Sequence, residues 1–201
     1  MPAVHASQER PRHVGRPRSM QAERAIIAAA LDEFAETGPQ GLCIEKVAAK
    51  AGVGKATIYR RWPGKEDLLL DAIAAMGTPL PQPKGESVRE DLAALLDAMG
   101  RECGDPRWAR QFALLLGDGV AYPRLLERYL DTVVEPRREV VRAVLLRGVA
   151  TGELREEANV EAAVDMLTGA ILARPRLGRD QLDRGYARRI VDELLIGLAS
   201  R

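Results

Sequence analysis

A cluster of basic and hydrogen-bonding side chains between residues 55 and 65 carries the groups best suited to recognise a partner. Lysine and arginine supply cationic donors, while hydroxyls and small side chains allow close approach to a hydrogen-bonding surface. The members of this cluster are Lys55, Ala56, Thr57, Tyr59, Arg60 and Lys65. The chemistry that they indicate is reversible recognition of a polyanion by hydrogen bonds and ion pairs.

The residues around this cluster have the spacing of a DNA-binding helix-turn-helix. The segment from Glu45 to Trp62 reads EKVAAKAGVGKATIYRRW. Ala48 is small where two helices cross, Gly52 permits the left-handed backbone of a turn, and Ile58 is aliphatic where the second helix packs back. A helical hairpin inside an ordinary core would explain the apolar spacing but not the basic cluster. The pattern therefore predicts that the second helix presents its first residues to bases and phosphates.

The residue types needed for catalysis or metal binding are scarce. Both histidines, His5 and His13, fall in a polar N-terminal stretch, so the folded part has no imidazole for a general base or a metal ligand. Cys43 and Cys103 fit no zinc spacing or disulfide framework, which favours a reducing compartment. We therefore expect no catalytic residue, no metal and no cofactor, and we do not expect an enzyme.

The charge is distributed unevenly along a chain whose net charge is only +1. Residues 1–65 carry 11 basic and 6 acidic side chains, whereas residues 66–201 carry 19 and 23. A basic N-terminal third on a mildly acidic remainder favours a polyanion-binding head joined to a separate body. No apolar run approaches the roughly 18 residues of a membrane span, so we expect a cytoplasmic protein without a membrane partner.

Apolar residues recur with helical period along most of the chain, and aromatic residues make up only 4% of it. The period begins at Met20, Gly38 ends the first helix, and Pro136 breaks or kinks a later one. No strand is predicted. The expected helices are 20–37, 44–51, 55–62, 64–76, 88–103, 106–116, 123–150, one that includes 160–171 and one that includes 190–198.

These elements predict an all-α fold of about nine helices in three parts. A disordered basic arm is expected at residues 1–19. A three-helix DNA-binding head with the helix-turn-helix follows at 20–65, and a larger helical effector-binding and dimerisation domain occupies 66–201. The proline-rich stretch 78–87 is the expected joint or long loop.

The N-terminal arm contains a second basic motif. Its sequence Gly15-Arg16-Pro17-Arg18 is similar to the core of an AT-hook, in which an extended segment inserts arginines into a narrow minor groove. Arg16 and Arg18 are therefore predicted DNA contacts. The alternative is a solvated basic tail, whose arginines add only salt-dependent, sequence-independent affinity.

A continuous segment near the N-terminus resembles the TetR family of regulators. The matching text runs from Ala25 to Met76, through AIIAAALDEFAETG, IEKVAAKAGVGKATIYRRW and GKEDLLLDAI, and covers about a quarter of the chain. The stretch from Pro136 to Leu198 also resembles a regulatory domain of that family. One position departs from the pattern: where the family usually has a hydroxyl residue at the start of the second helix, this chain has Cys43 and Ile44. A thiol is a poor N-cap and a poor phosphate donor.

The resemblance implies a homodimer that presents two recognition helices to successive major grooves of a palindromic operator in double-stranded DNA, with half-sites about 34–36 Å apart. By the family pattern, Lys55 contacts a base, Thr57 and Tyr59 meet phosphates, and Lys65 contacts the DNA backbone. The implied function is a sequence-specific transcriptional regulator, a repressor released from its operator by a small-molecule effector, although activation stays open. The alternative is an architectural DNA-binding protein without effector control.

The resemblance also assigns two roles to the body. The last two helices would pair with their copies across a two-fold axis, although each could use the same residues in its own core. The predicted dimer-interface residues are Val160, Val164, Leu167, Ile171, Ile190, Leu194 and Leu198. The helices before them would enclose a largely apolar effector, although for any single lining residue plain core packing is the favoured role. The predicted pocket residues are Met99, Trp108, Phe112, Tyr122, Tyr129 and Met166.

Overall fold

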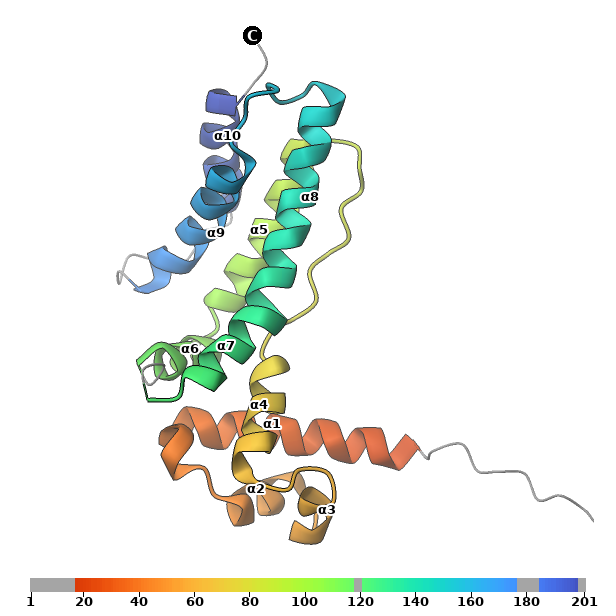
Figure 1. Ribbon diagram of the computed structural model, residues 1–201, viewed down its shortest axis with the longest axis vertical. Coiled ribbons are helices and arrows are strands. Elements are labelled where there is room, and N and C mark those ends of the chain that lie inside the picture. The colour runs from red at the N-terminus through yellow and green to blue at the C-terminus, as the bar shows by residue number, and fades with distance from the viewer. Residues whose placement is uncertain (1–16, 118–120, 177–184, 199–201) are drawn as a thin grey trace, which may run out of the picture.

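The computed structural model describes residues 17–117, 121–176 and 185–198, and within these ranges every regular element is a helix (Figure 1). A π-helical segment, η1, joins α7 to α8 without a break, so the described helices form nine continuous stretches. The prediction of an all-α fold with about nine helices is confirmed. The elements are α1 Pro17–Gly41, α2 Ile44–Ala51, α3 Lys55–Tyr59, α4 Lys65–Ala74, α5 Val88–Cys103, α6 Pro106–Gly117, α7 Pro123–Tyr129, η1 Leu130–Val134, α8 Glu135–Thr151, α9 Val160–Arg176 and α10 Tyr186–Leu198.

Several helix boundaries differ from the predicted ones by a few residues; α4, for example, is Lys65–Ala74 rather than 64–76. Helix α1 begins at Pro17 rather than Met20, because proline has no N–H to leave unpaired in a first turn and its φ already suits a helix. Helix α3 ends at Tyr59, and Arg60 and Arg61 form a turn before Pro63, so the predicted extension of this helix to residue 62 is wrong.

The predicted disturbance at Pro136 takes the form of a π-helical segment directly before it. Proline cannot donate a hydrogen bond to the carbonyl four residues earlier, and its ring crowds that carbonyl. The backbone of η1 widens ahead of the proline, and α8 then continues to Thr151.

The head, which we define as α1 to α3, is built over a small apolar core. Phe34 of α1, Val47 of α2 and Ile58 of α3 are all completely buried. At Gly38 the backbone takes φ 70° and ψ −176°, which interrupts α1 and directs the chain toward α2. Helix α4 packs against α1 and leads toward the body.

The body, which we define as α5 to α10, is organised around α5. Helices α8, α9 and α10 all pack against α5, and Leu92, Leu95 and Leu96 of α5 are completely buried. In Figure 1, α5 and α8 run along the long axis of the molecule, with the head at one end. The head is therefore positioned by α4, which packs on α1 and α7, and by α6, which packs on α1.

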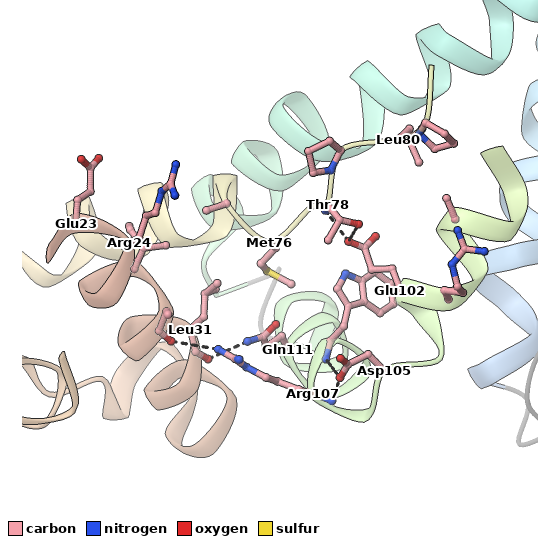
Figure 2. A pocket seen from close by; sticks show the side chains of 18 of the residues that line it. Glu23, Arg24, Leu31, Met76, Thr78, Leu80, Glu102, Asp105, Arg107 and Gln111 are labelled. Atoms are coloured by element: carbon pink, nitrogen blue, oxygen red, sulfur yellow. Dashed lines mark hydrogen bonds between the residues drawn. The ribbon is translucent and has the colours of Figure 1, made fainter. Parts of the chain in front are cut away.

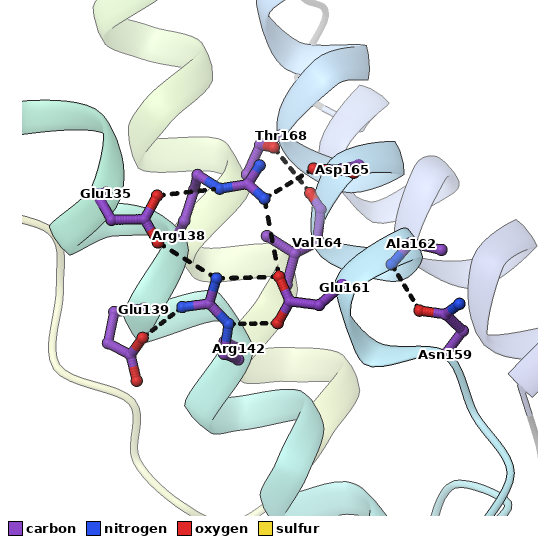
Figure 3. Close-up of polar contacts among 10 residues, drawn as sticks. All are labelled: Glu135, Arg138, Glu139, Arg142, Asn159, Glu161, Ala162, Val164, Asp165 and Thr168. Atoms are coloured by element: carbon purple, nitrogen blue, oxygen red, sulfur yellow. Dashed lines mark hydrogen bonds and ion pairs between the residues drawn. The ribbon is translucent and has the colours of Figure 1, made fainter. Parts of the chain in front are cut away.

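An ion-pair network fastens α9 to α8 (Figure 3). The guanidinium of Arg142 lies 2.5 Å from Glu161, and that of Arg138 lies 2.7 Å from Asp165. Arg142 lowers the pKa of the Glu161 carboxyl below its ordinary value. At the start of α9, the side chain of Asn159 accepts the N–H of Ala162 at 3.0 Å, which caps the helix.

The joint between α4 and α5 is anchored at its start by a buried acid–arginine pair. Arg137 of α8 donates to both carboxylate oxygens of Glu102 on α5, and these two side chains are only 11% and 6% exposed. Thr78 closes the triad, because its N–H donates to Glu102 at 2.8 Å and its carbonyl accepts from Arg137 at 2.9 Å.

A second buried acid anchors the other end of the joint. The Asp91 carboxylate accepts the backbone N–H groups of Lys84 at 2.7 Å and Gly85 at 2.9 Å, and Arg147 of α8 donates to it at 2.8 Å. Burial by itself would raise the pKa of Asp91, but these donors together lower it below its ordinary value. The segment 78–85 is thus tied to both α5 and α8.

Candidate nucleic-acid interface

The turn between α2 and α3 has the geometry that the sequence predicts. Gly52 adopts φ 67° and ψ 32°, the left-handed conformation in which a glycine avoids a Cβ clash. The N–H of Val53 donates to the carbonyl of Ala48 at 3.0 Å and closes the end of α2. Ala48 and Ile58 are both buried where the two helices meet. This turn therefore sets the direction in which α3 leaves α2.

Helix α3 presents most of the predicted contact residues to the outside. Lys55, Ala56, Tyr59 and Arg60 are exposed, and Thr57 is half-buried. The Tyr59 ring is 49% exposed although tyrosine usually buries much of its ring, so its hydroxyl is free to reach a partner. The single buried residue of α3, Ile58, holds this face in place.

An acid of α2 holds the first side chain of α3. The Lys55 ammonium donates to Oε1 of Glu45 at 2.9 Å, and the Cys43 thiol donates to Oε2 of the same carboxylate at 3.3 Å. The hydrogen bond from Lys55, followed in size by a backbone hydrogen bond and the hydrogen bond from Cys43, lowers the pKa of Glu45 to about 2. The same contact raises the pKa of Lys55. Both groups are therefore charged at neutral pH.

Cys43 occupies the N-cap position of α2 and makes no capping hydrogen bond with its side chain. Its backbone is extended, with φ −119° and ψ 117°, as an N-cap requires. The expectation that a thiol caps poorly is thus met in the geometry: the thiol turns toward Glu45 instead.

The remaining basic groups of the head differ in how they are held. Lys65 donates from Nζ to the carbonyl of Gln40 at 3.0 Å and so ties the start of α4 to the end of α1. Arg61 pairs with Glu23 of α1 at 2.5 Å and lies over the ring of Trp62. Lys65 remains exposed at the predicted position, whereas Arg61 is engaged with α1.

A buried carboxylate in the head escaped the sequence analysis. Glu33 is completely buried, and its oxygens lie 3.2 Å from the ammonium of Lys46 and 3.3 Å from that of Lys50, although they accept no hydrogen bond in the described part of the chain. These two ion pairs link α1 to α2. A signal was available, since Glu33 continues the buried stripe of Ile26 and Ala30 at helical spacing.

The predicted contacts of the N-terminal arm are only partly within the described residues. Gly15 and Arg16 lie outside them, and of Arg18 only the backbone is described, as part of α1. Pro17 and Arg18 are helical, so the extended backbone expected through Gly15–Arg18 is not present at its second half.

The predicted effector-pocket residues are mostly buried, and three of their aromatic rings pack on one another. The Trp108 and Phe112 rings stack with centroids 4.8 Å apart, and the Tyr129 ring follows at 5.4 Å from Phe112. Met99 is also buried and Tyr122 is half-buried, but Met166 is 61% exposed on α9. The three rings fill the core by packing on one another, and only Trp108 also lines the groove that lies between head and body.

The predicted dimer residues are divided by burial. Val164, Leu167 and Ile171 are buried within the protomer, because α9 packs on α5 and α8, so they offer no surface to a second chain. Three more are half-buried against the same core: Val160, Ile190 and Leu194. The side chain of Leu198 lies outside the described residues. Among the side chains of α9 and α10 that the structure describes, the large apolar ones that are exposed are Met166 and Ile196, and Ile196 was not predicted.

The described ranges contain no group of three or more His, Cys, Asp or Glu side chains placed to hold a metal ion. None of their helices is both long enough and apolar enough to cross a membrane.

Comparison with known proteins agrees with this architecture over nearly the whole chain. Residues 26–72 match the family described as bacterial regulatory proteins of the tetR family, and residues 82–194 match the tetracyclin repressor-like C-terminal domain. The uncharacterized HTH-type transcriptional regulator YdeS of Bacillus subtilis is 32% identical over 88% of this chain and 89% of its own length.

Solved structures show the same fold. A crystal structure of a regulator assigned to the TetR family from Mesorhizobium loti has a TM-score of 0.71 at 20% identity, and covers 92% of this chain and 100% of its own. The transcriptional regulator FadR of Bacillus subtilis in complex with stearoyl-CoA has a TM-score of 0.68 at 21% identity, and covers 87% and 98%. Since the C-terminal match alone spans more than half of the chain, this protein belongs to the TetR family of helix-turn-helix transcriptional regulators.

Proposed function

We propose that this regulator is a homodimeric repressor that binds a palindromic operator through α3 and leaves it when a small molecule binds. The observation that carries the proposal is the exposed face of α3, where Lys55 and Tyr59 are exposed while Ile58 is completely buried, and Arg60 is exposed directly after the helix. A helix fixed by one buried residue and bearing cationic and hydroxyl groups suits the major groove, which admits a single helix.

The roles of individual side chains follow from their positions. Lys55 is at the N-terminus of α3, where recognition helices touch base edges, and we assign it a base contact. Thr57 and Tyr59 would donate their hydroxyls to phosphates, and Lys65 would reach the DNA backbone from the start of α4. Lys65 would exchange its bond to the Gln40 carbonyl for a phosphate, which is a stronger acceptor.

The dimer would form through the outer surface of α9 and α10. Met166 is 61% exposed on α9 and Ile196 is 74% exposed on α10, and large apolar side chains gain free energy when a second copy covers them. The two α3 helices of such a dimer would have to meet operator half-sites about 34–36 Å apart.

Control by an effector requires contacts that carry a change in the body to the head. Two sets of contacts are suitable. At one, Arg107 of α6 pairs with Asp32 of α1 at 2.7 Å. At the other, Arg124 of α7 pairs with Glu66 of α4 at 2.8 Å. A ligand that binds one arrangement of α6 and α7 more tightly would shift the population toward the corresponding head position. The structure of the similar regulator FadR in complex with stearoyl-CoA supports the proposal that a small molecule regulates this protein.

The decisive experiment is selection of bound sequences from a random DNA library at near-physiological salt. A dimeric repressor should enrich one inverted repeat and prefer it by about 10³-fold or more over random DNA. Binding that is sensitive to salt but enriches no repeat would instead support the architectural alternative.

A further inference from the structure

A groove of about 990 Å³ runs between the head and the body (Figure 2). One wall is α1, the other is formed by α5 and α6, and the segment that follows α4 closes one side. In Figure 2, Arg24 lies toward the α1 side and Glu102 toward the α5 side, with Met76 between them. Its apolar surface is provided by Ile27, Leu31, Met76, Leu80 and Trp108.

The acidic side chains of this groove are already engaged. Glu23 pairs with Arg61, Glu102 with Arg137, and Asp105 accepts the N–H groups at the start of α6. The charges of Glu23 and Glu102 are therefore balanced by arginines, whereas Asp105 is held by backbone N–H groups alone.

Two of the basic side chains of the groove, in contrast, are unpaired. Arg24 of α1 and Arg101 of α5 line it, and neither makes an ion pair or a hydrogen bond with any described residue. The third, Arg107, is engaged with Asp32. The groove lining carries three acidic and three basic side chains, and Arg24 and Arg101 are the two cations among them without a described counterion, beside an apolar surface.

A buried polar group in the same groove also has no partner. Trp108 is only 8% exposed, and its Nε1–H finds no acceptor within the described ranges. Buried indole N–H groups usually find an acceptor, because leaving one unpaired costs about 1–3 kcal/mol. The wall of the groove at Trp108 therefore contains a polar group whose hydrogen-bonding capacity no described residue meets.

We propose that this groove binds an amphipathic organic carboxylate. Its apolar part would cover Met76, Leu31 and Trp108, and its carboxylate would pair with the guanidinium of Arg24 or of Arg101. Regulation from this site rests on the proposed function above. A molecule between α1 and α6 would hold the head at one angle to the body and so alter the match of two α3 helices to an operator.

The test uses the full-length protein and dodecanoate as the probe, below its micelle concentration, in isothermal titration calorimetry. Dodecanol and dodecyltrimethylammonium are the neutral and cationic controls of equal chain length. We expect saturable binding of dodecanoate at one site per protomer, and binding at least about tenfold weaker for either control, since one charge-assisted hydrogen bond is worth roughly that factor.

Variants locate the site. Ala28 is exposed and lines the groove, so Ala28→Trp fills it without disturbing the core and should abolish binding; Ala143→Trp, at an exposed position of α8 outside the groove, should not. Arg24→Gln or Arg101→Gln should weaken dodecanoate binding about tenfold. The matched control is Arg155→Gln, which removes an exposed charge elsewhere.

The outcomes separate this site from the proposed function. Binding that survives Ala28→Trp, or that is equally tight for dodecanol, would overturn the carboxylate site even if a palindrome is selected from the DNA library. Dodecanoate binding that follows the variants, in a chain that selects no palindrome, would support the site and overturn the repressor. With both present, dodecanoate should change operator affinity for the natural chain but not for Ala28→Trp.

Discussion

Oε1 of Glu45 on α2 lies 2.9 Å from the ammonium nitrogen of Lys55, the first residue of α3. The two charges face each other across the turn of the helix-turn-helix, and both side chains are more than half exposed. DNA must therefore compete with a carboxylate of the protein itself for the lysine proposed to contact a base. Such a contact restrains Lys55 in the free protein and disfavours weak, non-specific partners.

Replacing this acid should strengthen DNA binding. In Glu45→Gln, Lys55 loses its ion pair and the approaching phosphates lose a nearby negative charge, so we expect affinity for random DNA to rise about three- to tenfold at low salt, and less at high salt. Fluorescence anisotropy with labelled DNA measures this, with Glu86→Gln as a control of equal charge change at an exposed position of the joint. Weaker binding by Glu45→Gln would show that the acid positions Lys55 for DNA.

Replacing Lys55 should lower the affinity for the operator more than the affinity for random DNA. For Lys55→Ala we expect a decrease of roughly 5- to 100-fold in affinity for the selected repeat, the range of one good base contact, and relaxed preference at one position of each half-site. Lys84→Ala serves as the control, because Lys84 is exposed in the joint and far from α3 in the sequence. An equal loss for random DNA and operator would reassign Lys55 to a phosphate.

The turn offers a comparison of two glycines. A methyl group added at Gly52 or at Gly54 would meet no atom within 4 Å, but only Gly52 has positive φ. We therefore expect Gly52→Ala to lower the free energy of unfolding by about 1–2 kcal/mol through its left-handed backbone. Gly54→Ala should lower it by about 0.5 kcal/mol or less, as an N-cap change. Urea denaturation distinguishes them, and equal effects would rule out the backbone conformation as the cause.

The buried Asp91 should make stability depend on pH in the acid range. Its pKa is lowered in the folded protein, so its contribution is fully present above the unfolded pKa, about 3.9, and is lost as the pH falls through the lower folded value. Asp91→Asn should lower the free energy of unfolding by about 2 kcal/mol at pH 7. Below pH 4, the free energy of unfolding of this variant should fall less steeply with pH than that of the natural chain. Asp97→Asn, at an exposed position of the same helix, should behave like the natural chain. Identical acid slopes for natural chain and Asp91→Asn would contradict this assignment.

The exposed apolar residues of α9 and α10 should matter only for assembly. We expect the double variant Met166→Glu and Ile196→Glu to raise the dimer dissociation constant by about a hundredfold or more, because two charges per chain would be buried at the interface, while helix content stays unchanged. Sedimentation equilibrium measures this. Leu130→Glu, at an exposed position of η1, is the control. A double variant that remains as dimeric as the control would place the interface elsewhere.

Much of the fold could be predicted because its signals are local. The boundaries of α2 and α5 depend on apolar spacing, on Gly52 and on the Ser87 cap, and each lies within a few residues of the element it ends. The exposed face of α3 also follows locally, since one buried residue, Ile58, decides which side chains point outward. For these features the chain interacts chiefly with its near neighbours in sequence.

Contacts between distant segments could not be predicted in the same way. An apolar stripe on α9 fits a dimer interface as well as a protomer core, and only packing on α5 and α8 decided that Val164 and Leu167 are buried inside. Likewise, only the tertiary structure shows that the Trp108 ring stacks on Phe112 and that the Tyr129 ring packs beside Phe112 at a tilt.

The sequence by itself thus determined the helices, the helix-turn-helix and the residues that α3 exposes, because helical period and turn chemistry act over a few residues. The tertiary structure alone decided that Glu45 faces Lys55, that Glu33 is buried beside two lysines, and that Arg24 and Arg101 line one groove between head and body. Ion pairs and cavities depend on which surfaces of separate helices meet, and helical spacing specifies only the face, not the partner.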